Sequence, residues 1–441
     1  MNEILNRSPI EVDASRNEGL GPVLLIYLHV AACFVSMAHV VQYYAPLMRL
    51  TVATSDKLWL AALNVAPFAL LSILFAVCRF SFGYLVGFYF FTMLMGYLWL
   101  LPLSTFSYDH LVAYASAFTS GLAFLFPRHA GVDTGQTEVR FVGGRLSKVA
   151  DLHIGVRRRD CWSRRALQCE AGRDLRNLQF PQPARISGLA LVRAWSHLER
   201  PAAVRLCLFR RRRRQVAGRP VPAAAVHILS DHPEQAFLFA PVWLILLAVA
   251  SRGFTARTAV TLSLLVPILF GIVLARLFDL NAISYQQFIA YFSLVNFRMI
   301  ALTSSALDFY NDFFAHHDLT WFCQVNVLKS FIDCPYREPL AIVMQNAYNV
   351  GNFNASLFAT EGIASVGVIL APLAAFICGL VVAVGNSASS GLPSRFVLLS
   401  AGVLPQIFLN VSLTVTFVTN GAALLFILWY MTPRTLFGKK A

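Results

Sequence analysis

Long apolar runs separated by short polar stretches dominate this chain. Four of them open the sequence, at residues 22–45, 58–77, 82–103 and 110–126. Six more follow, at residues 236–250, 257–278, 288–308, 363–384, 393–411 and 413–431. Most of them approach the roughly 20 apolar residues that cross a bilayer as a helix. The pattern predicts an all-α, polytopic membrane protein with about ten transmembrane helices, because a helix satisfies its own backbone polar groups in lipid.

Composition agrees with a membrane protein. Of the 441 residues, 57% are hydrophobic and only 13% are charged, whereas soluble domains carry about 25% charged residues. Aromatic side chains gather near the ends of the first runs, which is typical of side chains at the headgroup level: Tyr43, Tyr44, Trp59, Tyr97, Trp99 and Tyr108. The first twenty residues are polar and mixed in charge, so we expect no removable signal peptide.

Residues 127–235 interrupt the hydrophobic pattern. Between Arg128 and Gln235 there are 20 Arg and one Lys against nine acidic residues, so this segment carries +12 of the chain's net charge of +14. The basic character therefore belongs to one segment, and we expect no nucleic-acid partner. The chain divides into N-terminal membrane helices (1–126), an Arg-rich non-membrane segment (127–235) and C-terminal membrane helices (236–441).

Two explanations of the Arg-rich segment stand side by side. It is either a cytoplasmic, mostly disordered insert whose basic tracts lie against anionic lipid headgroups, or a stretch translated out of its native frame. We favour the second, because Arg without Lys, together with Pro, Ala and Gly, is what a GC-rich gene yields when it is misread. Neither explanation assigns chemistry or a metal site to this segment.

The orientation of the helices follows from the flanking charges. Arg434, Lys439 and Lys440 favour a cytoplasmic C-terminus, and counting the runs backward places one large loop, residues 309–362, outside. This loop holds Cys323 and Cys334. We expect two unpaired thiols, with a disulfide as the alternative if this side is oxidising.

Arg298 is the most informative residue, because it lies in the middle of the apolar run FSLVNFRMIALTSSALDFY. An arginine there costs about 2.5 to 3.5 kcal/mol on insertion scales, so its side chain should face the bundle interior or a wet cavity. One explanation is a structural ion pair with Asp308 or Glu361. The other, which we favour, is an anion clamp, because a guanidinium matches phosphate oxygens.

The loop after Arg298 is rich in groups that suit sugars and pyrophosphate. His316 and His317 are candidates for a base or a phosphate donor, although exposed loop histidines usually have no function. Glu361, before Gly362, is either a carboxylate at a helix start or part of the site. The candidate substrate-binding side chains are aromatic, amide or guanidinium groups: Tyr310, Arg337, Tyr348, Asn352 and Asn354.

The order of these motifs resembles that of a known family. An Arg within a hydrophobic helix precedes aromatic–Asp–Phe–Phe before His, then Pro-Tyr, then NFNASLFATEG, then SVGVILAPLAAFICGLV. This order is similar to bacterial O-antigen and exopolysaccharide repeat-unit polymerases of the Wzy type, over 236–435 and more loosely over 22–126. Thr360-Glu361 stands where Ala-Asp is common in the family, Ser365 stands where an Asn-Phe pair is usual, and 127–235 matches nothing in it.

The resemblance implies a multi-pass, metal-independent glycosyltransferase of the bacterial inner membrane, without a cofactor. Such enzymes polymerise undecaprenyl-pyrophosphate-linked oligosaccharide repeat units at the outer face, and their partners include the bilayer, a chain-length regulator and a flippase. Arg298 would hold the leaving pyrophosphate, and His316, His317 or Glu361 would accept the proton of the attacking sugar hydroxyl. The alternatives are an O-antigen ligase, a transporter of lipid-linked oligosaccharide or polysaccharide, and an inactive membrane remnant.

Overall fold

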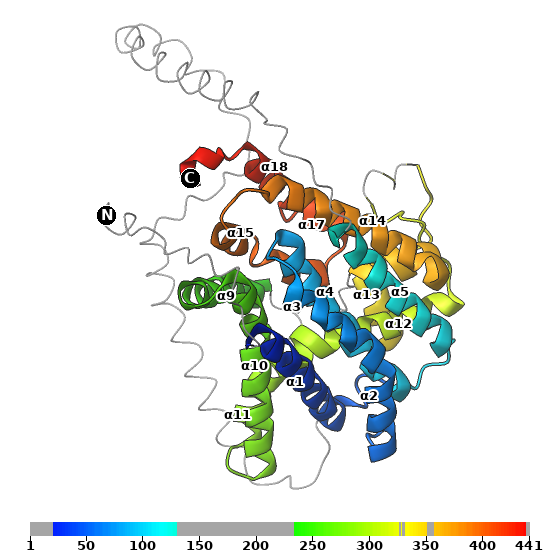
Figure 1. Ribbon diagram of the computed structural model, residues 1–441. Coiled ribbons are helices and arrows are strands. Elements are labelled where there is room, and N and C mark those ends of the chain that lie inside the picture. Colours follow the sequence, from blue (N-terminus) through cyan, green and yellow to red (C-terminus); the bar gives the residue numbers. More distant parts are fainter. Residues whose placement is uncertain (1–20, 130–232, 326–327, 329–330, 351–356, 438–441) are drawn as a thin grey trace, which may run out of the picture. The chain divides into compact units, whose positions relative to one another are not determined.

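The computed structural model describes residues 21–129, 233–325, 328, 331–350 and 357–437 (Figure 1). The described residues are mainly helical and contain no strand, only one isolated bridge between Leu50 and Ser104. The predicted all-α class is therefore confirmed for this part of the chain. The expectations for the Arg-rich segment, and for Asn352 and Asn354, lie outside the described residues apart from the margins of that segment.

The α-helices follow the apolar runs closely. Their bounds are α1 (Gly21–Tyr44), α2 (Ser55–Ala69), α3 (Ile73–Val77), α4 (Phe82–Leu100), α5 (His110–His129), α9 (Pro233–Gly253), α10 (Ala256–Asp279), α11 (Tyr285–Phe292), α12 (Leu302–His316), α13 (Leu340–Tyr348), α14 (Ser365–Ser389), α15 (Ser394–Ala401), α16 (Leu404–Asn410), α17 (Leu413–Val418) and α18 (Ala422–Met431). Two π-helices, Ser293–Ala301 and Phe358–Ala364, lead into α12 and α14. Short 3-10 turns cover Leu70–Ser72, Leu101–Leu103 and Arg434–Phe437.

Seven of the helices in the described residues are long and apolar enough to cross a membrane, which is consistent with a multi-pass membrane protein. They cover Gly21–Tyr44, Ser55–Val77, Phe82–Leu103, His110–Pro127, Ala256–Asp279, Tyr285–His316 and Phe358–Ser389. These match seven of the ten expected runs, and the figure of ten spans stays a prediction.

The other three runs differ from a single long span. The apolar part of α9, Ala240–Gly253, is shorter than a span. The last two runs are each broken into two short helices, α15 with α16 and α17 with α18. Pro405 lacks the N–H that would continue α15 into α16, and Gly421, at a φ of 79°, separates α17 from α18.

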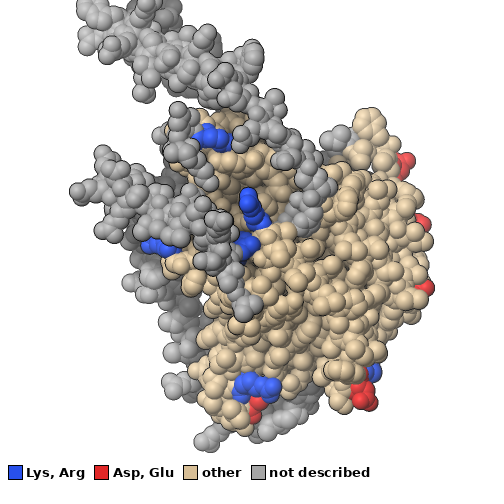
Figure 2. Space-filling model, in the orientation of Figure 1, with Lys and Arg blue, Asp and Glu red and all other residues tan. Residues whose placement is uncertain are grey.

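Helix α4 forms the centre of the unit to which the described residues belong. Every residue of α4 is buried, and the helix contacts α1, α2, α5, α10, α12, α14 and α16. Its aromatic side chains bind the surrounding helices together, as Phe90 does by packing against Phe124 and Phe358. The face shown in Figure 2 has a broad surface without charged side chains, as expected of a surface that meets lipid.

Helices α5 and α14 lie side by side, and this pair positions the site described below. At Gly379 a Cβ atom would lie 2.6 Å from the carbonyl oxygen of Phe124, so only glycine allows the two backbones to approach this closely. Farther toward its start, α14 is broken at Gly367, whose φ of 77° and ψ of 167° are not helical. The break and the first turns of α5 border the same cavity.

Candidate functional site

Arg298 lies within one continuous span, Tyr285–His316, that joins α11, the π-helix and α12. Its side chain is exposed, while the neighbouring Asn296 and Phe297 are buried. Of the two surroundings expected for Arg298, the bundle interior is therefore wrong. The π-helical turn explains the arrangement, because it directs the short amide of Asn296 inward to donate to Ser36 Oγ (2.8 Å) and leaves the guanidinium at the surface.

The histidine pair stands at the far end of the same helix. The span does not leave the helix near Asp308 as expected but continues to His316, because Asn311 donates within the bundle, to Leu307 O (2.8 Å) and to Tyr97 Oη (3.0 Å). The loop that was predicted to lie outside thus begins at residue 317 rather than at 309. Arg298 and His316 are separated by about 27 Å along the axis, at 1.5 Å per residue, so the structure does not bring them into one pocket.

Both histidines are exposed and bond back to their own helix. The Nδ1 of His316 lies 2.9 Å from the carbonyl oxygen of Asp312, and the Nδ1 of His317 lies 2.8 Å from that of Phe313. A carbonyl only accepts, so each Nδ1 carries a proton, as it does in the cationic ring and in one of the two neutral tautomers. The ring of His317 stacks on Phe313 with centroids 3.9 Å apart.

Glu361 is buried in the π-helix Phe358–Ala364. Its Oε1 accepts from the backbone N–H of Leu413 (2.9 Å) and its Oε2 accepts from Thr360 Oγ1 (2.6 Å). Leu413 is the first residue of α17, so the carboxylate satisfies a helix-start donor next to the break between α16 and α17. Both carboxyl oxygens are thereby occupied by structural hydrogen bonds.

The predicted substrate-binding residues are dispersed. Tyr310 is fully buried, and its hydroxyl has no hydrogen-bond partner among the described residues. The hydroxyl of Tyr348 donates to Asp312 Oδ2 (2.7 Å), and burial together with this bond raises the pKa of Tyr348. Arg337 is exposed in the loop. Neither of the two cavities described below is lined by Tyr310, Arg337 or Tyr348.

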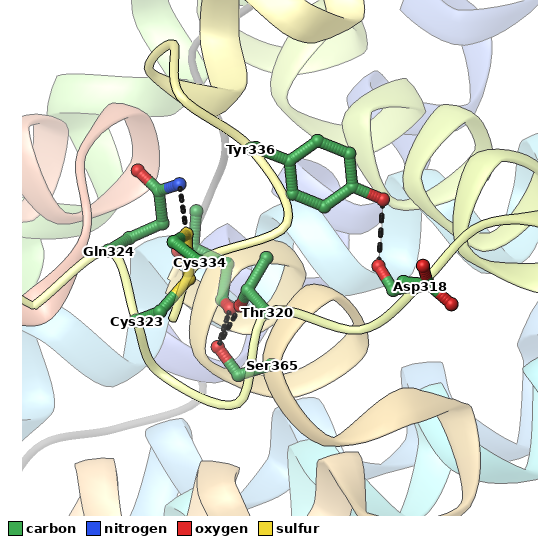
Figure 3. Close-up of a disulfide and its surroundings, with 8 residues drawn as sticks. Asp318, Thr320, Cys323, Gln324, Cys334, Tyr336 and Ser365 are labelled. Atoms are coloured by element: carbon green, nitrogen blue, oxygen red, sulfur yellow. Dashed lines mark hydrogen bonds between the residues drawn. A yellow bond between two sulfur atoms is a disulfide. The ribbon is translucent and has the colours of Figure 1, made fainter. Parts of the chain in front are cut away.

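A disulfide joins Cys323 to Cys334, so the expectation of two unpaired thiols is wrong (Figure 3). Sequence spacing did not indicate the pairing, because it depends on how the loop folds back: the two Cα atoms come within 5.2 Å. Nearby, the hydroxyl of Tyr336 donates to the carbonyl oxygen of Asp318 (2.7 Å), which draws the two sides of the loop together.

The segment before the disulfide completes the broken helix α14. The N–H of Thr320 donates to Ala364 O (2.8 Å) and the N–H of Trp321 donates to Ser365 O (3.0 Å). In an unbroken helix these carbonyls would accept from residues beyond Gly367, which the kink moves away. The hydroxyls of Thr320 and Ser365 lie 3.2 Å apart, as Figure 3 shows. The loop therefore stabilises a non-helical turn in a membrane-span helix.

The break in α14 borders a cavity of about 130 Å³ between α5, α12 and α14. Its lining combines three polar side chains with aromatic and aliphatic ones: Tyr108, Asp109, Val112, Ala113, Asn311, Phe314, Ala315, Ile363 and Val368. The ring of Phe314 contacts the loop through Tyr336 (6.0 Å between centroids). A smaller pocket shares Ala113, Asn311 and Ile363 with this cavity and extends toward Tyr97.

The backbone at the cavity wall is held by side chains of α5. Pro372 has no N–H to donate to the carbonyl of Val368, four residues before it. Ser116 supplies the missing donor, because its hydroxyl donates to Val368 O. The irregular backbone next to the cavity is thus satisfied from both sides, as non-helical backbone at membrane depth requires.

Four polar side chains form a connected hydrogen-bond network at the cavity wall, where Tyr108 and Asn311 line the cavity and Tyr97 and Asp308 do not. Asn311 donates to Tyr97 Oη (3.0 Å), the hydroxyls of Tyr97 and Tyr108 lie 3.2 Å apart, and Tyr108 donates to Asp308 Oδ1. Asp308 is only 1% exposed, and its Oδ2 forms no hydrogen bond with the described residues, although Ser104 lies near the carboxyl. Burial raises the pKa of Tyr108, which keeps the phenol protonated.

Sequence reasoning did not connect these residues. Tyr97 and Tyr108 were interpreted as interfacial aromatics, and Asp308 as one of two ion-pair partners for Arg298. The one available signal was Asp308 itself, because a carboxyl inside an apolar span indicates a function by default. Its actual partner is 200 residues away in the sequence, and no local pattern predicts such a contact.

Comparisons with known proteins do not assign this chain to a family. No protein-family model, no curated protein and no solved structure matches the chain.

Proposed function

We propose that this chain is a membrane glycosyltransferase that polymerises lipid-pyrophosphate-linked oligosaccharide repeat units, at the membrane face that carries the loop 317–357. The proposal combines the motif order described above with the cavity between α5, α12 and α14. The hydroxyl, amide and aromatic side chains of its wall suit a sugar, which needs a few placed polar groups within an otherwise apolar surface. Seven candidate spans provide the bilayer setting that a lipid-linked substrate requires.

The Cys323–Cys334 disulfide is the observation that carries this proposal. Disulfides persist in oxidising compartments such as the bacterial periplasm and are rare in the cytosol. The disulfide-bonded loop contacts the cavity wall at Phe314 and the broken helix at Ala364 and Ser365. A cavity on the oxidising face of an inner membrane is where exported, lipid-linked sugars would be joined.

The geometry changes which groups would hold the pyrophosphate. Cations are needed because the leaving group is a stable dianion. His316 and His317 follow directly after the cavity-lining residue Ala315 and are exposed, so we assign them this role. Arg298, about 27 Å away along the helix axis, lies outside the proposed pocket.

Expression in the strain of origin, after deletion of its chromosomal copy, tests the proposal. The surface glycan is then separated on a gel. We expect a ladder of repeat lengths from the wild-type chain and loss of the ladder from the double variant His316→Ala/His317→Ala. Arg395→Ala, an exposed arginine on α15, serves as the matched control and should keep the ladder. A surface glycan with a single repeat from the wild-type chain rejects polymerisation and favours a ligase.

A lipid-linked oligosaccharide transporter is the second candidate, and a specific observation favours it. Transporters use discontinuous helices near their substrate sites, and the structure breaks the runs at 393–411 and 413–431 and kinks α14 at Gly367. Reconstitution into vesicles distinguishes the two functions. A transporter moves a fluorescent lipid-linked repeat between leaflets without lengthening it, whereas a polymerase lengthens it.

A further inference from the structure

We infer that Tyr108 and Asp308 form a proton relay that activates a sugar hydroxyl bound in the cavity between α5, α12 and α14. This inference rests on the proposed function and names the groups that would perform its chemistry. Tyr108 lines the cavity, and we assign it the catalytic role, in which its hydroxyl would meet the sugar. Asp308 lies behind it, bonded to the same hydroxyl, and acts through it.

The direction of every proton in the network follows from counting donors. Asn311 contributes an amide N–H to Tyr97 Oη, and the single proton of Tyr108 is donated to Asp308. Tyr97 must therefore donate its own proton to Tyr108 Oη across the 3.2 Å between their hydroxyls. All donors point toward the carboxylate, and the Tyr108 oxygen keeps one lone pair that can accept from a ligand.

The proton acceptors expected from the sequence, Glu361 and the two histidines, are less well placed. Both oxygens of Glu361 already accept structural hydrogen bonds, from Leu413 N and Thr360 Oγ1. The two histidines lie on the exposed surface at the end of α12 and do not line the cavity. Asp308 combines burial, a carboxyl oxygen without a hydrogen bond among the described residues and a direct bond to a cavity-lining hydroxyl.

The step then balances as follows. The O–H bond of the acceptor sugar breaks as its proton passes to Tyr108 Oη, while the proton of Tyr108 passes to Asp308 Oδ1. The sugar oxygen forms a bond to the anomeric carbon of the lipid-linked donor, and the bond from that carbon to pyrophosphate oxygen breaks. The lipid pyrophosphate leaves with the electron pair, and Asp308 ends the step protonated. A relay of this kind contributes by lowering the barrier for hydroxyl attack.

Kinetics of the full-length chain in nanodiscs test the relay, with purified lipid-linked repeat units as the substrate. Tyr108→Phe and Asp308→Asn should each lower kcat by about 10² to 10⁴ while leaving KM unchanged, and the wild-type solvent deuterium isotope effect on kcat should change in both. Tyr114→Phe is the matched control, because Tyr114 lies six residues after Tyr108, in the first turns of α5, but donates to Asn64 O (3.1 Å) outside the cavity. Thermal unfolding of each variant shows whether it is folded.

Each outcome is decisive. An inactive wild-type chain rejects the proposed function and the relay with it. An active wild-type chain whose folded Tyr108→Phe variant keeps its kcat rejects the relay alone. If the Asp308→Asn variant is unfolded, the Tyr108→Phe variant still tests the relay, since phenylalanine keeps the ring and removes only the hydroxyl.

Discussion

Two buried carboxyl groups in membrane-span helices, Asp308 and Glu361, have opposite surroundings. Glu361 accepts two hydrogen bonds, one of them from the first residue of α17. Asp308 accepts one from Tyr108 and has a second oxygen that forms no hydrogen bond with the described residues. Glu361 joins helices across a break, whereas Asp308 stands behind the wall of a cavity. From the sequence alone, Glu361 looked like the site residue and Asp308 like a structural partner.

The number of hydrogen bonds to the carboxyl oxygens therefore separates a structural role from a role in proton transfer better than the residue type does. A buried carboxyl whose two oxygens both accept structural hydrogen bonds contributes stability and has fewer acceptor sites left for a ligand. One with a remaining acceptor next to a cavity can take part in proton transfer. The comparison predicts that substitutions around Asp308 affect turnover and that substitutions around Glu361 affect stability.

The largest expected effect separates the two carboxyls by activity. Asp308→Asn should lower kcat by about 10² to 10⁴, because the amide cannot accept the relayed proton. Glu361→Gln should leave kcat near that of the wild type, because it keeps an oxygen for Leu413. Single-turnover chain extension in nanodiscs measures both, and equal losses in the two variants would contradict the division of roles.

The second largest effect is expected from removing the Cys323–Cys334 disulfide, which lies in the loop that contacts α14. Cys323→Ser/Cys334→Ser should lower the free energy of unfolding by about 3 kcal/mol, since the crosslink closes a short loop and restricts the unfolded chain. Chemical unfolding in detergent, followed by tryptophan fluorescence, measures the change. Cys78→Ser, which lies outside the disulfide, is the control, and a similar loss there would show that the effect is not due to the crosslink.

Glu361→Ala should destabilise the chain by about 1 to 3 kcal/mol, because it leaves the part-buried N–H of Leu413 without its acceptor. Glu361→Gln should recover most of this loss. The exposed Glu338, which accepts only from Asn346 (3.3 Å), is the control, and its alanine variant should change stability by less than about 0.5 kcal/mol. Thermal unfolding of the three variants side by side gives the result.

The smallest effect concerns the backbone at the cavity wall. Ser116→Ala should lower the free energy of unfolding by about 1 kcal/mol, because Val368 O loses the donor that replaces the missing N–H of Pro372. Thr119→Ala, an exposed position on the same helix whose hydroxyl bonds only within α5, should change stability less. A Thr119 effect that matches the Ser116 effect would mean that helix propensity, and not the Val368 contact, is being measured.

Much of the fold could be predicted because each long helix coincides with one apolar run of the sequence. The run at 82–103 predicted α4 and the turn after it, and the run at 257–278 predicted α10 to within one residue at each end. The end of α12 was predicted less well. Asn311 and Asp312 look like loop residues by type, yet Asn311 continues the helix because Tyr97, distant in sequence, accepts from it. Polarity alone does not reveal such a partner.

The candidate site could be predicted only in part. The sequence singled out Asp308, Glu361 and the histidines, and it left Glu361 open between a helix-start carboxylate and a site residue. The hydrogen bonds of Glu361 fit the first of these, and the bond between Tyr108 and Asp308 was not predicted. Arg298 was placed in the right helix, but its exposure depends on the π-helical turn, which shifts the direction of the side chains that follow. The pairing of Cys323 with Cys334 depends likewise on the fold of the loop.

The sequence by itself determined that the described part of this chain is all-α, where most of its long apolar helices lie, and that charged residues fall within the apolar runs, since each of these properties depends on residues near one another in the chain. Only the tertiary structure decided that Tyr108 meets Asp308, that Thr320 and Trp321 complete the broken α14, and that a cavity opens beside them. The physical reason is that a hydrogen bond requires two groups within about 3 Å of each other, and for groups far apart in sequence only the packed helices set that distance.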